Sequence, residues 1–234
     1  MIIDMKHMMA VLWKQIKDTF KNKEILIQFV MFPALTLIME NVVEVEGMPE
    51  HYFTNLFGVM FVGMAPLTSM ASIIAEEKEK NTLRALMMSN VKPAEYLLGV
   101  GVYNWCICML GACVIGFAGG HTGAAFGRFV VIMGIGIIVS IVIGAVIGTW
   151  SKTQMMATSL TVPVMLVFSF MPMLSMFSQG IEKVARVTYS QQIHSLIYQL
   201  DAIDSVAEPA AVIAVNMILA IILFIYAYRR SGLE

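Results

Sequence analysis

FVVIMGIGIIVSIVIGAVIGTWS, residues 129–151, is a stretch of 23 residues without a charged side chain. An α-helix rises about 1.5 Å per residue, so about 20 apolar residues cross the ~30 Å hydrocarbon core of a bilayer. A helix also satisfies its backbone hydrogen bonds within one segment, which hydrocarbon requires. The stretch therefore predicts a membrane-spanning helix, and it sets the fold class.

Five further uncharged stretches cover residues 25–39, 53–75, 96–127, 153–181 and 209–228. Four of these are long enough to span a bilayer, and the 15-residue first stretch is long enough if Glu24 and Glu40 lie in the two headgroup layers. Of the 234 residues, 59% are hydrophobic and 13% are charged, against about 25% charged in soluble domains. We therefore predict an all-α integral membrane protein with six transmembrane helices.

The distribution of cations predicts the orientation of these helices. If both termini are cytoplasmic, three of the 15 Lys and Arg residues lie outside, namely Arg128, Lys183 and Arg186, and the other twelve lie inside. Lys and Arg are enriched in cytoplasmic loops, so this orientation is the expected one. The net charge of −1 gives no reason to expect a nucleic-acid partner.

Two segments outside the spans have amphipathic patterns. Residues 1–23 place Met5, Met8, Met9, Leu12, Ile16 and Phe20 at helical spacing, which predicts an interfacial helix that precedes a six-span domain over residues 24–234. This helix is either an anchor or a site for a partner protein. The outer segment 179–208 repeats the pattern at Ile193, Leu196, Ile197 and Leu200, and it either caps an exit path or covers the bundle.

The fourth span carries a packing signal, because small residues recur at every fourth position: Gly136, Ser140, Gly144 and Gly148. Such a groove lets another helix approach closely. The partner helix belongs either to the same chain, which we favour, or to a second copy.

The fifth span contains Pro163 and Pro172, each of which removes a backbone hydrogen bond. Flexible, polarizable methionine side chains suit a promiscuous apolar ligand. We therefore consider a translocation path along this span at Met165, Met171, Met173 and Met176. The alternative is that methionine is simply abundant, since the chain has 21.

Several kinds of chemistry are disfavoured by what the sequence lacks. The six stretches contain no ionisable Asp, Glu, Lys or Arg, which argues against ion-coupled transport. Cys106, Cys108 and Cys113 share one span, and we expect them to be reduced thiols without a metal. No phosphate-binding G-x-x-x-x-G-K-[ST] loop and no H-E-x-x-H or G-x-S-x-G motif occurs, so we expect no catalytic residues.

A dense charged run interrupts the apolar sequence at AEEKEKNTLRALMMSN, residues 75–90. Leu83, Leu86 and Met87 follow helical spacing within it, which predicts a short amphipathic helix on the cytoplasmic side. Pro93 is expected to begin the next span, with Glu95 in its first turn. The alternative is an ordinary loop.

The segment IIAEEKEKNTLRALMMSNVKPAEYLLG, residues 73–99, resembles the first cytoplasmic loop of type-2 ATP-binding-cassette (ABC-2) transporter permeases. Asn81 stands where that family usually has glycine, and Ser89-Asn90 where Ser-Pro is common. The positions that match the family pattern are Glu76, Glu77, Lys78, Glu79, Thr82, Leu83, Pro93, Glu95, Leu98 and Gly99.

The resemblance implies that the loop over residues 76–95 docks onto a separate nucleotide-binding ATPase subunit, which binds ATP and Mg, while this chain binds no cofactor. It also implies two permeases per transporter, as a homodimer or a related heterodimer, in the plasma membrane of a prokaryote. The docking residues would be Glu76, Glu77, Lys78, Glu79, Thr82, Leu83, Leu86 and Met87, with the last three in the partner's groove.

Members of that family export drugs, peptides, lipids or polysaccharides. An uncharged interior rich in Met and Phe favours an amphipathic or apolar cargo, so we expect drug or peptide export. The alternatives are lipid or polysaccharide export by the same architecture, and a non-transport protein of membrane structure or assembly.

Overall fold

The computed structural model describes residues 5–21, 23–43, 47, 49–88, 91–200 and 206–230. Throughout these residues every regular element is a helix, which confirms the all-α fold class. The helices are α1 (Met5–Lys21), α2 (Lys23–Val42), α3 (Tyr52–Glu79), α4 (Thr82–Met88), α5 (Pro93–Ala118), α6 (Gly123–Trp150), α7 (Gln154–Ser175), α8 (Gln179–Ala185), α9 (Tyr189–Tyr198) and α10 (Ala207–Arg230).

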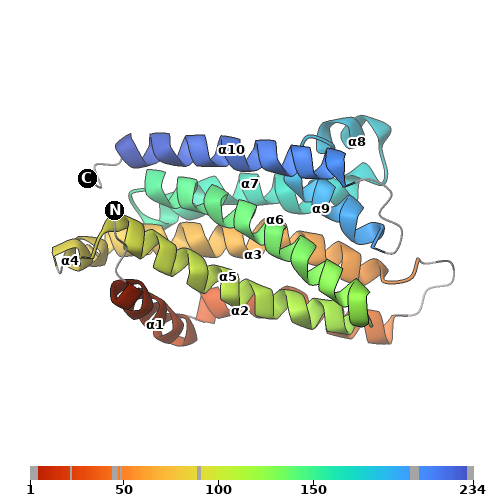
Figure 1. Ribbon diagram of the computed structural model, residues 1–234, viewed down its shortest axis with the longest axis horizontal. Coiled ribbons are helices and arrows are strands. Elements are labelled where there is room, and N and C mark those ends of the chain that lie inside the picture. The colour runs from red at the N-terminus through yellow and green to blue at the C-terminus, as the bar shows by residue number, and fades with distance from the viewer. Residues whose placement is uncertain are drawn as a thin grey trace.

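The long helices run along one axis, with α4 at one end of the bundle and α8 at the other (Figure 1). Five of them, α3, α5, α6, α7 and α10, are long and apolar enough to span a membrane. The apolar part of α2, Leu26–Val42, is shorter, at about 26 Å against the ~30 Å of a hydrocarbon core. The sixth span therefore stays a prediction.

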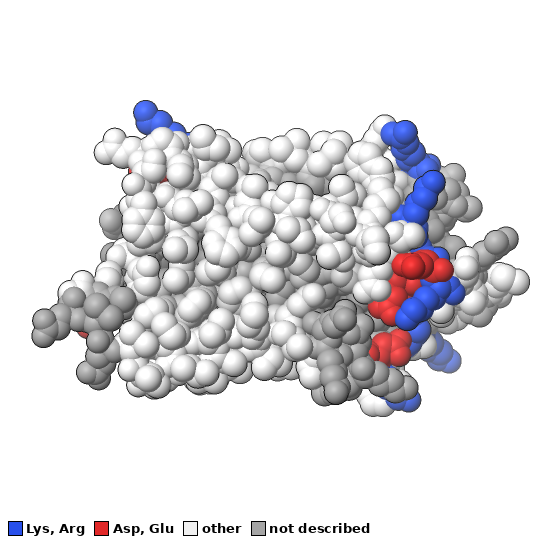
Figure 2. Space-filling model, turned by 180° about the vertical axis from the view of Figure 1, so that it is seen from behind, with Lys and Arg blue, Asp and Glu red and all other residues white. Residues whose placement is uncertain are grey.

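Charged side chains gather at one end of the molecule, with fewer at the other and an uncharged belt between (Figure 2). The densely charged end is the one that carries α4, and α10 also ends there, at Arg229 and Arg230 (Figure 1). An uncharged belt between two polar ends is the surface expected of a membrane-spanning bundle.

The helix α3 lies at the centre of the bundle and packs most extensively on α6 and α7. The small-residue groove of α6 faces α3 of the same chain. A Cβ added at Gly136 would meet Val62, one at Gly144 the Leu67 carbonyl, and one at Gly148 the Ala71 carbonyl. Ser140 Oγ donates to the Val62 carbonyl at 2.6 Å. Close approach of two backbones holds the central pair together.

The amphipathic segment at the other end of the bundle folds as α8 and α9, and its apolar face is turned inward. Ile193, Leu196, Ile197 and Leu200 are all buried, and Tyr189 and Ser140 share a hydrogen bond of 2.6 Å. Within the predicted outer segment 179–208 the structure has the helices α8 and α9, and the apolar face of α9 contacts the bundle rather than a membrane surface, because α9 packs on α3, α6, α7 and α10.

Candidate functional site at the charged end of the bundle

The charged run begins on the last turn of α3 and turns into α4 at Asn81. The backbone N–H of Lys80 donates to the Glu76 carbonyl, and Thr82 Oγ1 donates to the Glu77 carbonyl at 3.1 Å. Asn81 has φ of 55°, in the left-handed region that glycine adopts freely and asparagine tolerates. This conformation explains physically why asparagine can replace the glycine that is usual at this position.

The Asn81 turn can be tested by two substitutions. We expect Asn81→Ala to lower the free energy of unfolding by about 1 kcal/mol, because the left-handed conformation costs an ordinary side chain about 1–2 kcal/mol. Asn81→Gly removes that strain and should leave thermal unfolding of the detergent-solubilised protein unchanged or slightly raised. Equal stability of the two variants would contradict the role of the turn.

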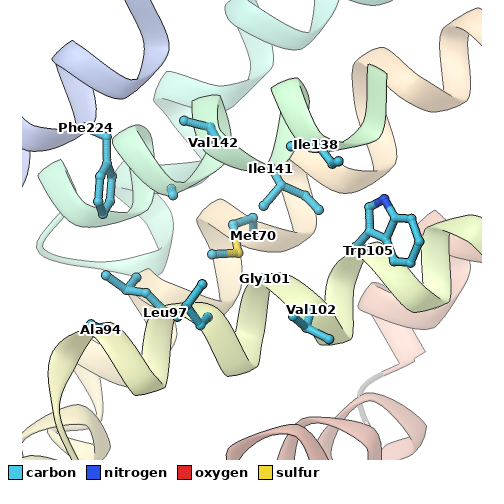
Figure 3. A pocket seen from close by; sticks show the side chains of 12 residues that line it. Met70, Ala94, Leu97, Gly101, Val102, Trp105, Ile138, Ile141, Val142 and Phe224 are labelled. Atoms are coloured by element: carbon cyan, nitrogen blue, oxygen red, sulfur yellow. The ribbon is translucent and has the colours of Figure 1, made fainter. Parts of the chain in front are cut away.

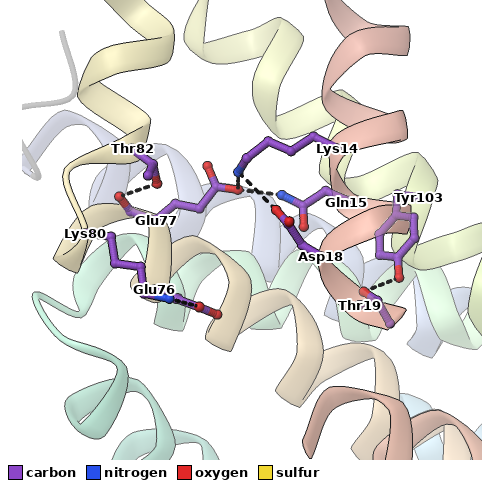
Figure 4. A network of polar contacts seen from close by, with 9 residues as sticks. All are labelled: Lys14, Gln15, Asp18, Thr19, Glu76, Glu77, Lys80, Thr82 and Tyr103. Carbon is purple, nitrogen blue, oxygen red and sulfur yellow. Dashed lines mark hydrogen bonds and ion pairs between the residues drawn. The ribbon is translucent and has the colours of Figure 1, made fainter. Parts of the chain in front are cut away.

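Glu77 connects the end of α3 to α1. It is 6% exposed, and its Oε1 accepts hydrogen bonds from Lys14 Nζ at 2.7 Å and from Gln15 Nε2 at 2.5 Å (Figure 4). Asp18 lies 3.6 Å from the same ammonium group. A carboxylate this buried requires such partners, since an unpaired buried charge is costly. The helix α1 is therefore fixed to the end of α3.

Lys78 and Glu79 connect α3 to two other helices. Lys78 Nζ donates to the Thr149 carbonyl in the last turn of α6 at 2.5 Å, and Glu79 Oε2 accepts the backbone N–H of Gln154, the first residue of α7, at 2.7 Å. Each charge has the sign that complements the dipole of the helix end it contacts. Two adjacent residues of opposite charge thus hold two helix ends of opposite polarity.

A further ionic contact joins α1 to the start of α5. His7 Nδ1 lies 3.0 Å from Glu95 Oε2, and the same oxygen accepts the backbone N–H of Lys92 at 3.1 Å. Pro93 begins α5 and Glu95 lies in its first turn, which confirms the predicted start of this span. Glu95 is 1% exposed, so it acts inside the chain as a cap.

Lys80 and Glu76 form the outer part of the run. Their side chains are 62% and 23% exposed, and Lys80 Nζ donates to Glu76 Oε1 at 2.5 Å. This hydrogen bond and the carboxylate charge raise the pKa of Lys80. Of the four charged residues predicted to dock onto a partner, Glu76 pairs with the exposed Lys80, whereas Glu77, Lys78 and Glu79 contact the chain's own helices.

The apolar face of α4 also packs inward, which corrects the expected placement of Leu83. This residue is 3% exposed and belongs to the main hydrophobic core, and Leu86 packs against the same core. Leu83 is therefore not available to fill a partner's groove in this conformation, and the docking role of the partly buried Leu86 stays a prediction. The Met87 side chain and Ser89-Asn90 lie outside the described part of the chain. The exposed side of α4 presents Ala85 and Met88 instead.

The methionines of α7 are not gathered around one cavity. Met165 packs against Leu67, Ala71 and Ile147, Met171 and Met173 are partly buried, and Met176 is exposed. A cavity of about 400 Å³ adjoins α7, but the side chains that line it from this helix are Leu160, Val164 and Phe168. The path along these four methionines stays a prediction that the cavity does not support.

No sequence pattern indicated the residues that contact Glu77, Lys78, Glu79 and Glu95, namely His7, Lys14, Gln15, Thr149 and Gln154. They lie 62 to 88 positions away from their partners along the chain. Only the packing of α1, α5, α6 and α7 around the end of α3 brings them together.

A comparison with protein-family models matches residues 10–229 to a family described as ABC-2 family transporter protein. No curated protein matches the chain. The matched residues include the whole charged run and the helices that contact it, with α1 included from residue 10 onward.

Proposed function

This chain belongs to the ABC-2 transporter family, and from this premise we propose that it is the permease subunit of an ATP-driven exporter. Membership establishes a multi-pass membrane component of an ABC transporter, which is not itself the ATPase. The finer proposal is that a separate nucleotide-binding subunit binds ATP and Mg and docks at the charged end. Export then follows from movement of the helices that this end connects.

The proposal rests on one observation: the charged run and α4 contact the bundle on one side and are exposed on the other. One side is fixed to the bundle through Glu77, Lys78 and Glu79, which contact α1, α6 and α7. The other side is exposed at Ala85 and Met88, the latter 82% exposed. A force applied to α4 would therefore reach α3 and, through the last turn of α3, the helices α1, α6 and α7, which is what coupling to a moving partner requires.

The docking surface we propose is the exposed side of α4, with Met88 as its apolar anchor and Lys80 and Glu76 at its rim. Interface anchors are large side chains that a partner covers, whereas exposed ion pairs contribute about 0–1 kcal/mol. We place this end in the cytoplasm because the chain's cations concentrate there, as Figure 2 shows.

The cargo we propose is an amphipathic or apolar drug or peptide. Support comes from a cavity of about 400 Å³ beside α7, which is lined almost entirely by apolar side chains. Such surfaces offer few hydrogen bonds to a sugar polymer. A second permease copy, identical or related, would complete the transporter in the plasma membrane. Exposed apolar faces on α7 and α10 leave room for it.

The docking surface is tested by Met88→Lys. This change places a charge on the proposed anchor while keeping a residue type that suits the end of a helix. We expect co-purification of the nucleotide-binding subunit to weaken at least tenfold, or about 1.4 kcal/mol, and cargo-stimulated ATP hydrolysis to fall with it. Expression and thermal unfolding of the permease should not change, because the Met88 side chain is 82% exposed.

The matched control is Met155→Lys, since Met155 is 80% exposed at the same end of the bundle but belongs to α7. We expect it to retain the ATPase subunit. Full retention by Met88→Lys, or equal loss with Met155→Lys, would show that docking does not depend on α4. Because a nucleotide-binding subunit meets only the cytoplasmic face, selective loss would also support the orientation.

A further inference from the structure

An apolar cleft of about 530 Å³ lies on the side of the bundle between α5 and α6. Figure 3 shows the residues of α5 along one wall and those of α6 along the other, with Met70 of α3 between them and Phe224 of α10 at one end. Small residues open the space, namely Ala94 and Gly101 on α5 and Ala145 on α6. The volume is that of a ligand-sized site.

The cleft has no polar group to offer an occupant. Its one polar side-chain atom, Trp105 Nε1, donates to the Gly134 carbonyl of α6 at 3.3 Å and ties the two helices together. A water molecule needs two to four polar partners, so the cleft does not suit water. Leu98, Val102 and Ile138 at its rim are 38–44% exposed, which opens it sideways to the hydrocarbon around the bundle.

The cleft has the length and direction of one lipid chain in one leaflet. It follows α5 from Ala94 to Trp105, a rise of about 16 Å along the helix axis. Half the ~30 Å hydrocarbon core is about 15 Å. Because α5 begins at the charged end, the cleft runs from the level of the headgroups at that end to the middle of the membrane.

Exposed cations lie at the end of the bundle toward which the cleft runs. Lys92 is exposed and precedes Ala94 by two residues, and Arg229 and Arg230 are exposed on the last turn of α10, five and six residues after Phe224. The nearest carboxylate in sequence, Glu95, is buried against His7 and the Lys92 backbone. This end therefore favours an anionic headgroup.

We propose that the cleft binds an anionic phospholipid of the leaflet at the charged end, with one acyl chain between α5 and α6 and the phosphate near Arg229 and Arg230. The lipid is a permanent component of the protein that fills the cleft between α5 and α6. This inference does not depend on the ATPase partner or on the identity of the cargo.

Fluorescence of Trp105 provides a direct test, because this side chain lines the deep end of the cleft. In a protein carrying Trp13→Phe and Trp150→Phe, Trp105 is the one remaining tryptophan. Phosphatidylglycerol with brominated acyl chains, titrated into the protein in detergent micelles, should quench it saturably. Brominated phosphatidylcholine should quench with lower affinity, and Arg229→Gln with Arg230→Gln should reduce that preference at least threefold.

The cleft is filled by Gly101→Leu, for which the only heavy atom near the added Cβ is Ile141 Cγ2 at 3.9 Å. We expect the affinity for the brominated lipid to fall at least fivefold, while Gly127→Leu, on an open surface of α6, leaves it unchanged. Ala94→Leu fills the opposite end of the cleft and should act like Gly101→Leu. Unchanged quenching in both filled variants would overturn the proposal. If the filled variants change the oligomeric state but not the quenching, the cleft is an interface with a second copy, and the lipid proposal is also overturned.

Discussion

Replacing Gly144 by leucine is expected to lower the free energy of unfolding by about 3 kcal/mol, at the upper end of the usual cost of overpacking. A Cβ at this position would press on the Leu67 carbonyl oxygen and lie 3.0 Å from Met70 Cβ. A carbonyl in the middle of α3 cannot rotate away as a side-chain end can. The central helix pair would have to separate, and with it the contacts that position the charged run.

Thermal unfolding of the detergent-solubilised protein measures this effect. Gly127→Leu is the matched control, because the added Cβ would have no heavy atom within 4 Å and leucine favours a helix over glycine. Gly148→Ala should have a smaller effect than Gly144→Leu, since it adds one methyl group 2.9 Å from the Ala71 carbonyl. Equal stability of the Gly144 and Gly127 variants would show that α3 and α6 do not pack in this way.

The second large effect is expected from Lys14→Met, which removes the cation that pairs with the buried Glu77 carboxylate and leaves Gln15 donating to its Oε1. Removing one member of a fully buried ion pair costs about 3–5 kcal/mol, but Lys14 is 34% exposed, so we expect about 2 kcal/mol. The loss should appear in thermal unfolding and as protease sensitivity of α1, because α1 depends on this contact with α3.

A double-mutant cycle measures the interaction free energy between Lys14 and Glu77 separately from their contacts with other residues. Glu77→Gln removes the buried charge, so adding it to Lys14→Met should recover about 1 kcal/mol of the loss. Lys17→Met, which removes an exposed cation stacked at 5.5 Å from the Trp13 ring, is the control on the same helix and should cost less than about 1 kcal/mol. Additive losses for the Lys14 and Glu77 changes would mean that the two side chains do not interact.

The positions of the long helices were predictable because insertion of a helix into a membrane depends on the hydrophobicity of consecutive residues. The uncharged stretch at residues 53–75 lies within α3, the stretch at 129–151 lies in α6 except for its last residue, and Pro93 with Glu95 marked the start of α5. Hydrocarbon excludes charge and unpaired backbone at every point along a span, so each residue reports its environment without reference to distant residues. The same reasoning was less decisive for α2, whose apolar part is short.

For the charged run, the sequence indicated the segment but not the surface that covers its apolar face. Its composition and resemblance identified residues 76–95 as a distinctive surface segment of an ABC-2 protein, and the family is shown by the match over residues 10–229. The pattern of Leu83 and Leu86 indicated an amphipathic helix, but any apolar surface can cover such a face. In the structure the chain's own core covers it, and Met88 is exposed instead.

The membrane class, the positions of the long helices and the segment that distinguishes the family could be predicted from the sequence, because they follow from local composition and local spacing. The charges that contact the chain's own helices could be identified only from the fold. Glu77, Lys78 and Glu79 are adjacent in sequence and similar in type to Glu76 and Lys80, yet they contact α1, α6 and α7. The direction of a charged side chain depends on the partner that compensates its loss of hydration, and here those partners are brought close only by the packing of α3 at the centre of the bundle.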